Sequence, residues 1–159
     1  MGQAMFYHLT RNPLQVTLGD LLDRSLDQGW NVVVRGRDAA RLATLDALLW
    51  QGPQARFLPH GVAGGAQDAD QPVLLTTGHD IPNGAVTLFS VDGADVTAAE
   101  VAQMQRVRIL FDGNSDAAVQ AARVQWKALT GAGCKAEYWS EESGKWQKKA
   151  KNERVAARC

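Results

Sequence analysis

The side chains best suited to chemistry stand close together in the run Asp112-Gly113-Asn114-Ser115-Asp116. Oxygen ligands at alternate positions are typical of a calcium-binding loop, but its sixth and twelfth positions need glycine and glutamate, where this chain has Ala117 and Arg123. A serine between a strand and a helix is also typical of a hydrolase nucleophile, but the histidine of that triad must follow it, and the last histidine is His79. We therefore expect Ser115 to cap a helix, and we predict no catalytic residue.

Two glycine-rich segments are candidate nucleotide sites, and neither has the required context. The segment 61–65 lacks the lysine of a phosphate-binding loop, which excludes an ATPase of that class. Residues 131–136 match the spacing of a dinucleotide fingerprint, but they follow a helix pattern and open a strand pattern, the reverse of what that site needs. We predict that they form a helix-ending turn. The three histidines show no metal-ligand spacing, so we expect neither a metal nor a cofactor.

A helix expected over about 115–130 carries the most interesting pattern in the chain. Val119, Arg123 and Trp126 follow one another at i, i+4 and i+7, which places them on one helix face. A guanidinium between an aliphatic side chain and an indole suits a peptide that ends in an apolar side chain and a carboxylate. The alternative is that Trp126 belongs to the core and Arg123 is simply solvated.

A second pattern lies where a helix ends at Gly52-Pro53. Trp50 and Phe57 stand at the two ends of a six-residue connection, followed by Pro59 and His60. Exposed loops normally carry small polar residues, so something apolar should cover these rings. They either fill the core or form a docking surface for a partner protein.

Alternating strand and helix patterns must position these groups. Helices are expected over 18–26, over 38 to about 50, and over 115–130. Apolar strands are expected over 6–9, 31–34, 73–76, 85–91, 107–111 and 135–139. Helices between apolar strands predict an α/β fold with a mostly parallel sheet and helices on both faces.

Charge and composition limit the classes of protein to which this chain can belong. The chain of 159 residues is neutral overall, but residues 145–159 hold six basic side chains and one acidic one. We expect one α/β domain over 1–144 and a basic C-terminal extension over 145–159, which we expect to be dispensable for folding. Only two cysteines and no long apolar run predict a cytoplasmic, unprocessed protein.

Several motifs together resemble the chi subunit of bacterial DNA polymerase III holoenzyme. The opening Met5-Phe6-Tyr7-x-Leu9 is similar to the first strand of that family. Leu45-Asp46-x-x-Leu49-Trp50 followed by Phe57-x-Pro59-His60 is similar to its most distinctive segment, and Trp126-Lys127 before Gly131 and Gly133 matches a late motif. The resemblance spans residues 5 to about 139. It implies a Rossmann-like or helicase-like topology without a nucleotide site, in a non-catalytic accessory subunit of the replicative polymerase.

The resemblance also implies partners. In the chi family the helix that carries Arg123 and Trp126 takes the acidic C-terminal tail of single-strand-binding protein (SSB). One member of the family has a lysine where this chain has Val119, so Lys127 or the basic extension is the expected substitute. Trp50, Phe57, Pro59 and His60 match positions that bind the psi subunit of the clamp-loader assembly, or a helicase that uses the same face. The alternatives from the residues alone are a small α/β hydrolase or nucleotide-dependent enzyme, and a module that binds nucleic acid directly.

Overall fold

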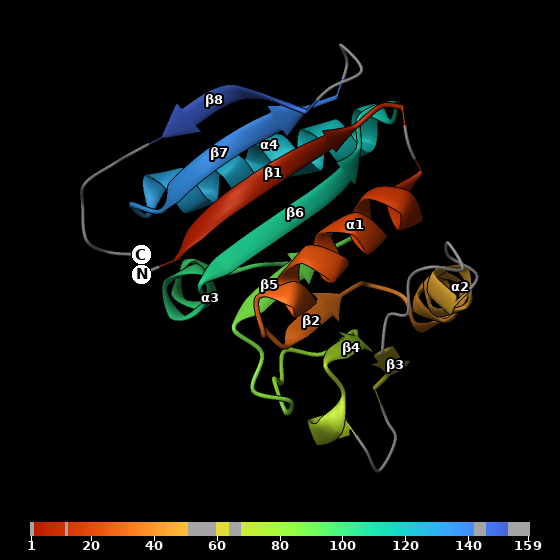
Figure 1. Ribbon diagram of the computed structural model, residues 1–159. Helices are drawn as coiled ribbons and strands as arrows, with labels where there is room; N and C mark the ends of the chain where they lie inside the picture. The colour runs from red at the N-terminus through yellow and green to blue at the C-terminus, as the bar shows by residue number, and fades with distance from the viewer. Residues whose placement is uncertain (1, 12, 51–59, 64–67, 142–145, 153–159) are drawn as a thin grey trace.

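The described chain alternates strands and helices from end to end (Figure 1). This computed structural model describes residues 2–11, 13–50, 60–63, 68–141 and 146–152. Its strands are β1 (Gln3–Leu9), β2 (Val32–Arg35), β3 (His60–Val62), β4 (Val73–Thr76), β5 (Thr87–Ser90), β6 (Arg106–Asp112), β7 (Lys135–Ser140) and β8 (Gln147–Asn152). Its helices are α1 (Leu14–Asp27), α2 (Ala39–Trp50), α3 (Ala98–Gln103) and α4 (Asp116–Gly131), with a 3-10 turn at Asp68–Asp70.

All the strands of the described residues join one sheet in the order β3-β4-β2-β5-β6-β1-β7-β8. Neighbouring strands are parallel except β7 and β8, which pair antiparallel. Trp139 faces Lys148 and Tyr138 faces Ala150, so β8 carries one extra residue, a β-bulge, between these pairs. The predicted α/β fold with a mostly parallel sheet is confirmed.

Two apolar layers cover opposite faces of the sheet because successive side chains of a strand point to opposite sides. Met5, Tyr7 and Leu9 of β1 join the core under α1 and α2, whereas Phe6 joins the core under α3 and α4. Central strands such as Val32–Arg35 are buried on both faces, as expected where helices cover a parallel sheet from both sides. Helices therefore lie on both faces, as the sequence predicted (Figure 1).

Four elements were missing from the sequence-based prediction: the short strand β3, the 3-10 turn at Asp68–Asp70, the short helix α3 and the edge strand β8. Residues 147–152 of the expected basic extension form β8 and belong to the sheet. The expected domain boundary at residue 144 stays a prediction, because residues 142–145 lie outside the described ranges. None of the described helices is long and apolar enough to cross a membrane.

An ion pair between a buried arginine and a partly buried glutamate holds α3 to the carboxyl end of β2. Arg35 is 1% exposed, and its Nη2 lies 2.7 Å from Oε2 of Glu100. Its guanidinium also donates to the carbonyl oxygens of Gly78 (3.1 Å) and Asp95 (3.1 Å). Glu100 additionally accepts from the backbone N–H of Thr97 in a capping box that begins α3. One carboxylate therefore joins β2 to α3 and sets where the helix begins.

Candidate functional site

Helix α4 carries the predicted Val119, Arg123 and Trp126 stripe, and local sequence signals fix both ends of the helix. Ser115 has extended backbone angles, and its hydroxyl accepts from the backbone N–H of Ala118 at 3.3 Å, so it is the predicted N-cap. At the other end Gly133 adopts φ +94°, and the N–H of Cys134 bonds back to the carbonyl of Leu129 at 3.0 Å. The predicted helix-ending turn is confirmed, since a positive φ favours glycine there.

The structure places the four predicted tail-binding residues on α4 at different depths. Val119 and Trp126 are half-buried and pack against the core on the α4 side of the sheet. Arg123 and Lys127 are exposed, and neither forms an ion pair with another residue of the described chain. The helix therefore presents two cations beside partly exposed apolar side chains. Trp126 is neither fully buried nor fully exposed, because its indole contacts the core and also forms part of the surface.

Aromatic side chains from three strands support Trp126 from below. Its ring meets Phe6 of β1 edge-on with centroids 5.3 Å apart, and it meets Tyr138 of β7 at 6.2 Å. The Tyr138 hydroxyl lies 2.8 Å from Nδ1 of His8, and the His8 ring stacks on Phe111 of β6 at 5.2 Å. Such ring pairs add to the stability gained from burial, so the indole is held in a fixed position.

A close approach by the chain between β6 and α4 holds His8 in place. The N–H of Gly113 donates to the carbonyl of Leu9 at 2.7 Å, which brings its backbone onto the imidazole. A Cβ at position 113 would overlap the His8 ring, so only glycine fits here. The Asp112-Gly113-Asn114 run that suggested an ion-binding loop is thus a tight turn, in which Asp112 Oδ1 accepts from the Asn114 N–H at 2.9 Å.

Comparison with known proteins identifies the family of this chain. A sequence profile of the family described as DNA polymerase III chi subunit, HolC, matches residues 1–137, which include the whole of α4. The chain belongs to this chi family. A protein of Rickettsia prowazekii (strain Madrid E), named as a probable DNA polymerase III subunit chi, is 25% identical over 111 residues. That match covers 70% of this chain and 66% of the length of the relative.

Membership of the chi family indicates an accessory role in DNA replication. The suspected resemblance is therefore confirmed at the level of the family. The second predicted surface cannot be located, since Phe57 and Pro59 lie outside the described residues. Trp50 is the last residue of α2 and His60 the first residue of β3, but their side chains are outside the description as well.

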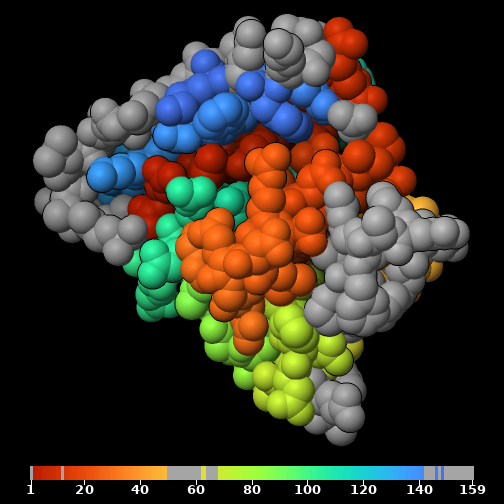
Figure 2. Space-filling model, viewed as in Figure 1, coloured from red at the N-terminus to blue at the C-terminus, as the bar shows by residue number. Residues whose placement is uncertain are grey.

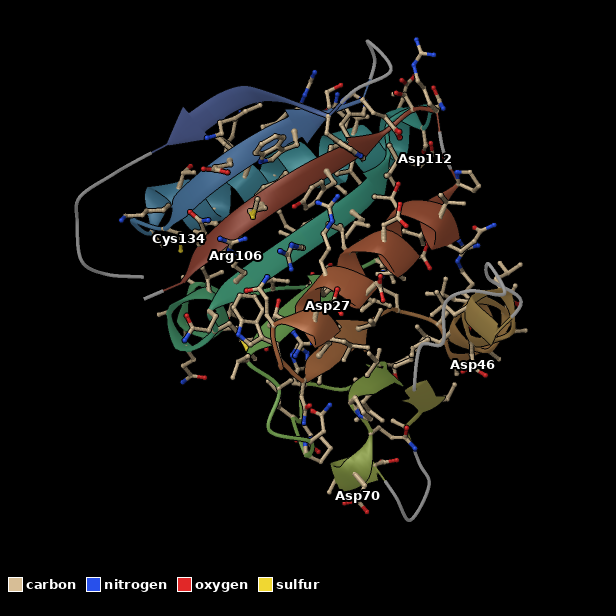
Figure 3. All side chains as sticks on the ribbon, viewed as in Figure 1. Asp27, Asp46, Asp70, Arg106, Asp112 and Cys134 are labelled. Atoms are coloured by element: carbon tan, nitrogen blue, oxygen red, sulfur yellow. The ribbon has the colours of Figure 1, made fainter. Side chains whose placement is uncertain are left out.

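A cavity of about 950 Å³ lies at the carboxyl ends of β1 and β6, where α/β enzymes of other families bind ligands. The carboxylates that line it already have local partners. Asp92 accepts two bonds from Arg41 (2.8 and 2.9 Å), and Asp38 accepts from the N–H of Ala40 (2.9 Å). Asp112, labelled in Figure 3, holds the turn described above. This arrangement does not bring a nucleophile and a base together, so it does not favour the hydrolase alternative.

The sequence-based prediction did not include the aromatic side chains that pack beneath Val119, Arg123 and Trp126 of α4. His8 and Tyr138 are 130 positions apart and meet only because β1 and β7 are neighbours in the sheet. The one available signal was alternation: Phe6, His8 and Tyr138 sit at alternate positions of strands, which predicts a shared face once the strand order is known.

Proposed function

We propose that this chi-family protein is a non-catalytic cytoplasmic adaptor that binds the acidic C-terminal tail of SSB through α4. The observation that carries the proposal is the pairing of exposed Arg123 and Lys127 with half-buried Val119 and Trp126 on one helix. A tail that ends in an apolar side chain and a carboxylate needs both properties at once: the guanidinium pairs with the carboxylate, and the indole packs the side chain.

The departure from the family pattern at Val119 fits this geometry. Lys127 follows Arg123 by one helical turn, so a second cation remains beside the guanidinium without a lysine at position 119. Val119 then adds apolar surface next to Trp126. We infer that tail recognition in this chain depends more on apolar packing, and less on the number of cations, than in relatives with a lysine there.

Substitution of Arg123 by Ala should weaken binding of a peptide copying the C-terminal tail of the cognate SSB. We expect a loss of about 2–3 kcal/mol, or about 30- to 150-fold in Kd, because the charge-assisted bonds to the carboxylate disappear. Titration calorimetry measures this loss. Arg24→Ala is a matched control, since it removes the same charge from an exposed position on α1. Equal affinity of Arg123→Ala and the unmodified protein would reject α4 as the tail site.

The same adaptor needs a second surface, which we assign to Trp50, Phe57, Pro59 and His60 on the family resemblance. This surface would bind the psi subunit of the clamp-loader assembly or a helicase that uses the same residues. Two modest interfaces on one small protein raise the local concentration of the clamp loader at SSB-coated strands without any new contact between the two partners.

Replacement of Phe57 by Ala separates docking from packing. We expect the variant to lose about 2 kcal/mol or more of partner binding and less than about 1 kcal/mol of folding stability. Co-purification with psi or helicase, run beside thermal unfolding, measures both. Val124→Ala, at an α4 side chain that is 68% exposed, should keep every partner. A strongly destabilised Phe57→Ala variant would instead place this ring in the core.

A further inference from the structure

Within the part of the chain that the structure describes, one face of the sheet lacks a covering helix at its β8 end. Helix α4 lies behind β7, on the side of Tyr138, and α1 covers β6 and β2 on the opposite side (Figure 1). No described helix lies in front of β7 and β8 on the α1 side (Figure 1). Atoms of β7 and β8 accordingly reach the surface in the same view (Figure 2).

This open face carries aromatic side chains that are far apart in the sequence. Trp139 is the register partner of Tyr7 across β1 and β7, so both lie on the same side of the sheet. Trp146 meets Tyr7 edge-on with centroids 5.3 Å apart. Both tryptophans are half-buried, packed against the core beneath and open to solvent above. We name Tyr7, Trp139, Trp146 and Lys148 the Trp139 face.

A cation is held beside these rings. Nζ of Lys148 lies 5.6 Å from the centre of the Trp139 ring and 3.2 Å from Oε2 of Glu137. The other Glu137 oxygen accepts from the Trp139 indole N–H at 3.1 Å. Glu137 is therefore engaged by both neighbours, and it fixes the indole and the ammonium relative to each other. The strand that supplies Lys148 lies within the segment 145–159, which holds six basic residues and one acidic one.

Protection of a sheet edge does not account for this combination. Lysines are common on edge strands because they prevent pairing with other chains. Edge protection needs only a charged side chain, so it does not explain why two partly exposed indoles lie beside Lys148. Indoles next to cations on an open surface are instead typical of proteins that bind single-stranded nucleic acid, where bases stack on the rings and phosphates lie along the cations.

We propose that the Trp139 face binds single-stranded nucleic acid directly. A base stacks on the exposed part of an indole, while Lys148 meets a phosphate beside it. An acidic peptide would satisfy the charge but offers a planar ring only where it carries an aromatic residue, whereas every nucleotide carries both a base and a phosphate. The proposal does not depend on the SSB-tail site, because Tyr138 serves the α4 face and Trp139 the opposite one. Trp139, Trp146 and Lys148 lie beyond residue 137, where the family match ends.

The test uses the full chain without SSB and a fluorescein-labelled oligothymidylate of about 15 nucleotides, within the usual site size of such proteins. Anisotropy at low salt gives the affinity, and a salt series gives its slope. Trp139→Ala should weaken binding by about tenfold or more, and Trp139→Phe should restore most of it because a ring remains. Lys148→Gln should reduce the salt slope by about 0.7, the change for one lost contact with a single strand.

A charge-matched control lies on α1, which covers β6 and β2. Arg24→Gln removes an exposed cation from α1 and should leave the slope unchanged, and circular dichroism should show that every variant is folded. The proposal is wrong if the oligonucleotide does not bind at low salt, or if Arg24→Gln and Lys148→Gln weaken binding equally. It is also wrong if polyglutamate displaces the oligonucleotide at equal charge concentration, which would make this an acidic-protein site, or if Trp139→Ala instead abolishes a dimer seen by sedimentation.

Discussion

Replacement of Glu100 by Gln should lower the free energy of unfolding by about 3–5 kcal/mol, because the buried guanidinium of Arg35 loses its charged partner. Gln keeps the shape of Glu and can still accept the Thr97 N–H, so the loss isolates the charge that faces Arg35. Arg35 cannot regain its partner from water, since its side chain is 2% exposed. Urea unfolding followed by circular dichroism measures the difference.

The chain provides a matched control at its surface. Arg41 and Asp92 form the same two-bond pair at 2.8 and 2.9 Å, but Arg41 is 64% exposed. Asp92→Asn should therefore cost less than about 1 kcal/mol, and Asn tolerates the φ of 55° found there. Equal losses for Glu100→Gln and Asp92→Asn would show that burial does not set the strength of the Arg35–Glu100 pair.

The effect of Glu100→Gln should depend on pH. Burial on its own would raise the pKa of Glu100, but the hydrogen bonds from Arg35 and the Thr97 N–H, together with the Arg35 charge, lower it below the ordinary value of 4.5. A carboxyl whose folded pKa is lowered stabilises the protein above its unfolded pKa and loses that contribution as pH falls through the folded value. The gap between the unmodified protein and Glu100→Gln should thus be constant near neutral pH and close below about 4.5.

Deletion of residues 146–159 should destabilise the protein, contrary to the expectation from sequence that the extension 145–159 is dispensable. The deletion removes β8 and the Trp146 ring that packs on Tyr7, so we expect a loss of about 3 kcal/mol or more. For a chain of this size the Tm should fall by about 6–12 °C in a thermal melt. Loss of β8 also exposes the edge of β7, so aggregation at high concentration should increase.

A second truncation shows whether β8 itself or the residues after it account for the loss of stability. A chain that ends at Asn152 keeps β8, and the difference between the two truncations isolates the strand from the residues after it. If the chain lacking 146–159 melts within about 2 °C of the longer one, β8 contributes little and the expectation of a dispensable extension is restored.

The sequence predicts most of this fold because its central elements carry strong signals. Strand β2 presents the apolar Val32, Val33 and Val34 to both faces of the sheet, and α4 has both a serine cap and an ending glycine. The strand β8, Gln-Lys-Lys-Ala-Lys-Asn, has no apolar alternation because it pairs with one neighbour and lies at the sheet edge. Helix α3 is only six residues long, and its one signal, Thr97 followed by Glu100, went unused in the prediction.

The candidate sites also differ in how far the sequence alone predicts them. The α4 stripe could be predicted because one helix carries all its members at regular spacing. The aromatic side chains beneath this stripe and the Trp139 face could not be predicted, because both depend on which strands are neighbours in the sheet. His8 meets Tyr138, and Tyr7 meets Trp146, only after β1 takes its place beside β7.

The bulge in β8 affects where insertions and deletions can be tolerated in this region. Side chains alternate along β7, so a one-residue insertion or deletion before Tyr138 would exchange the two faces of the strand and damage both surfaces together. The bulge already absorbs one extra residue in β8 while Lys148 stays opposite Trp139 and Lys151 stays opposite Glu137. Changes in length should therefore accumulate in β8 and in the connection before it, leaving β7 free of alignment gaps among close relatives.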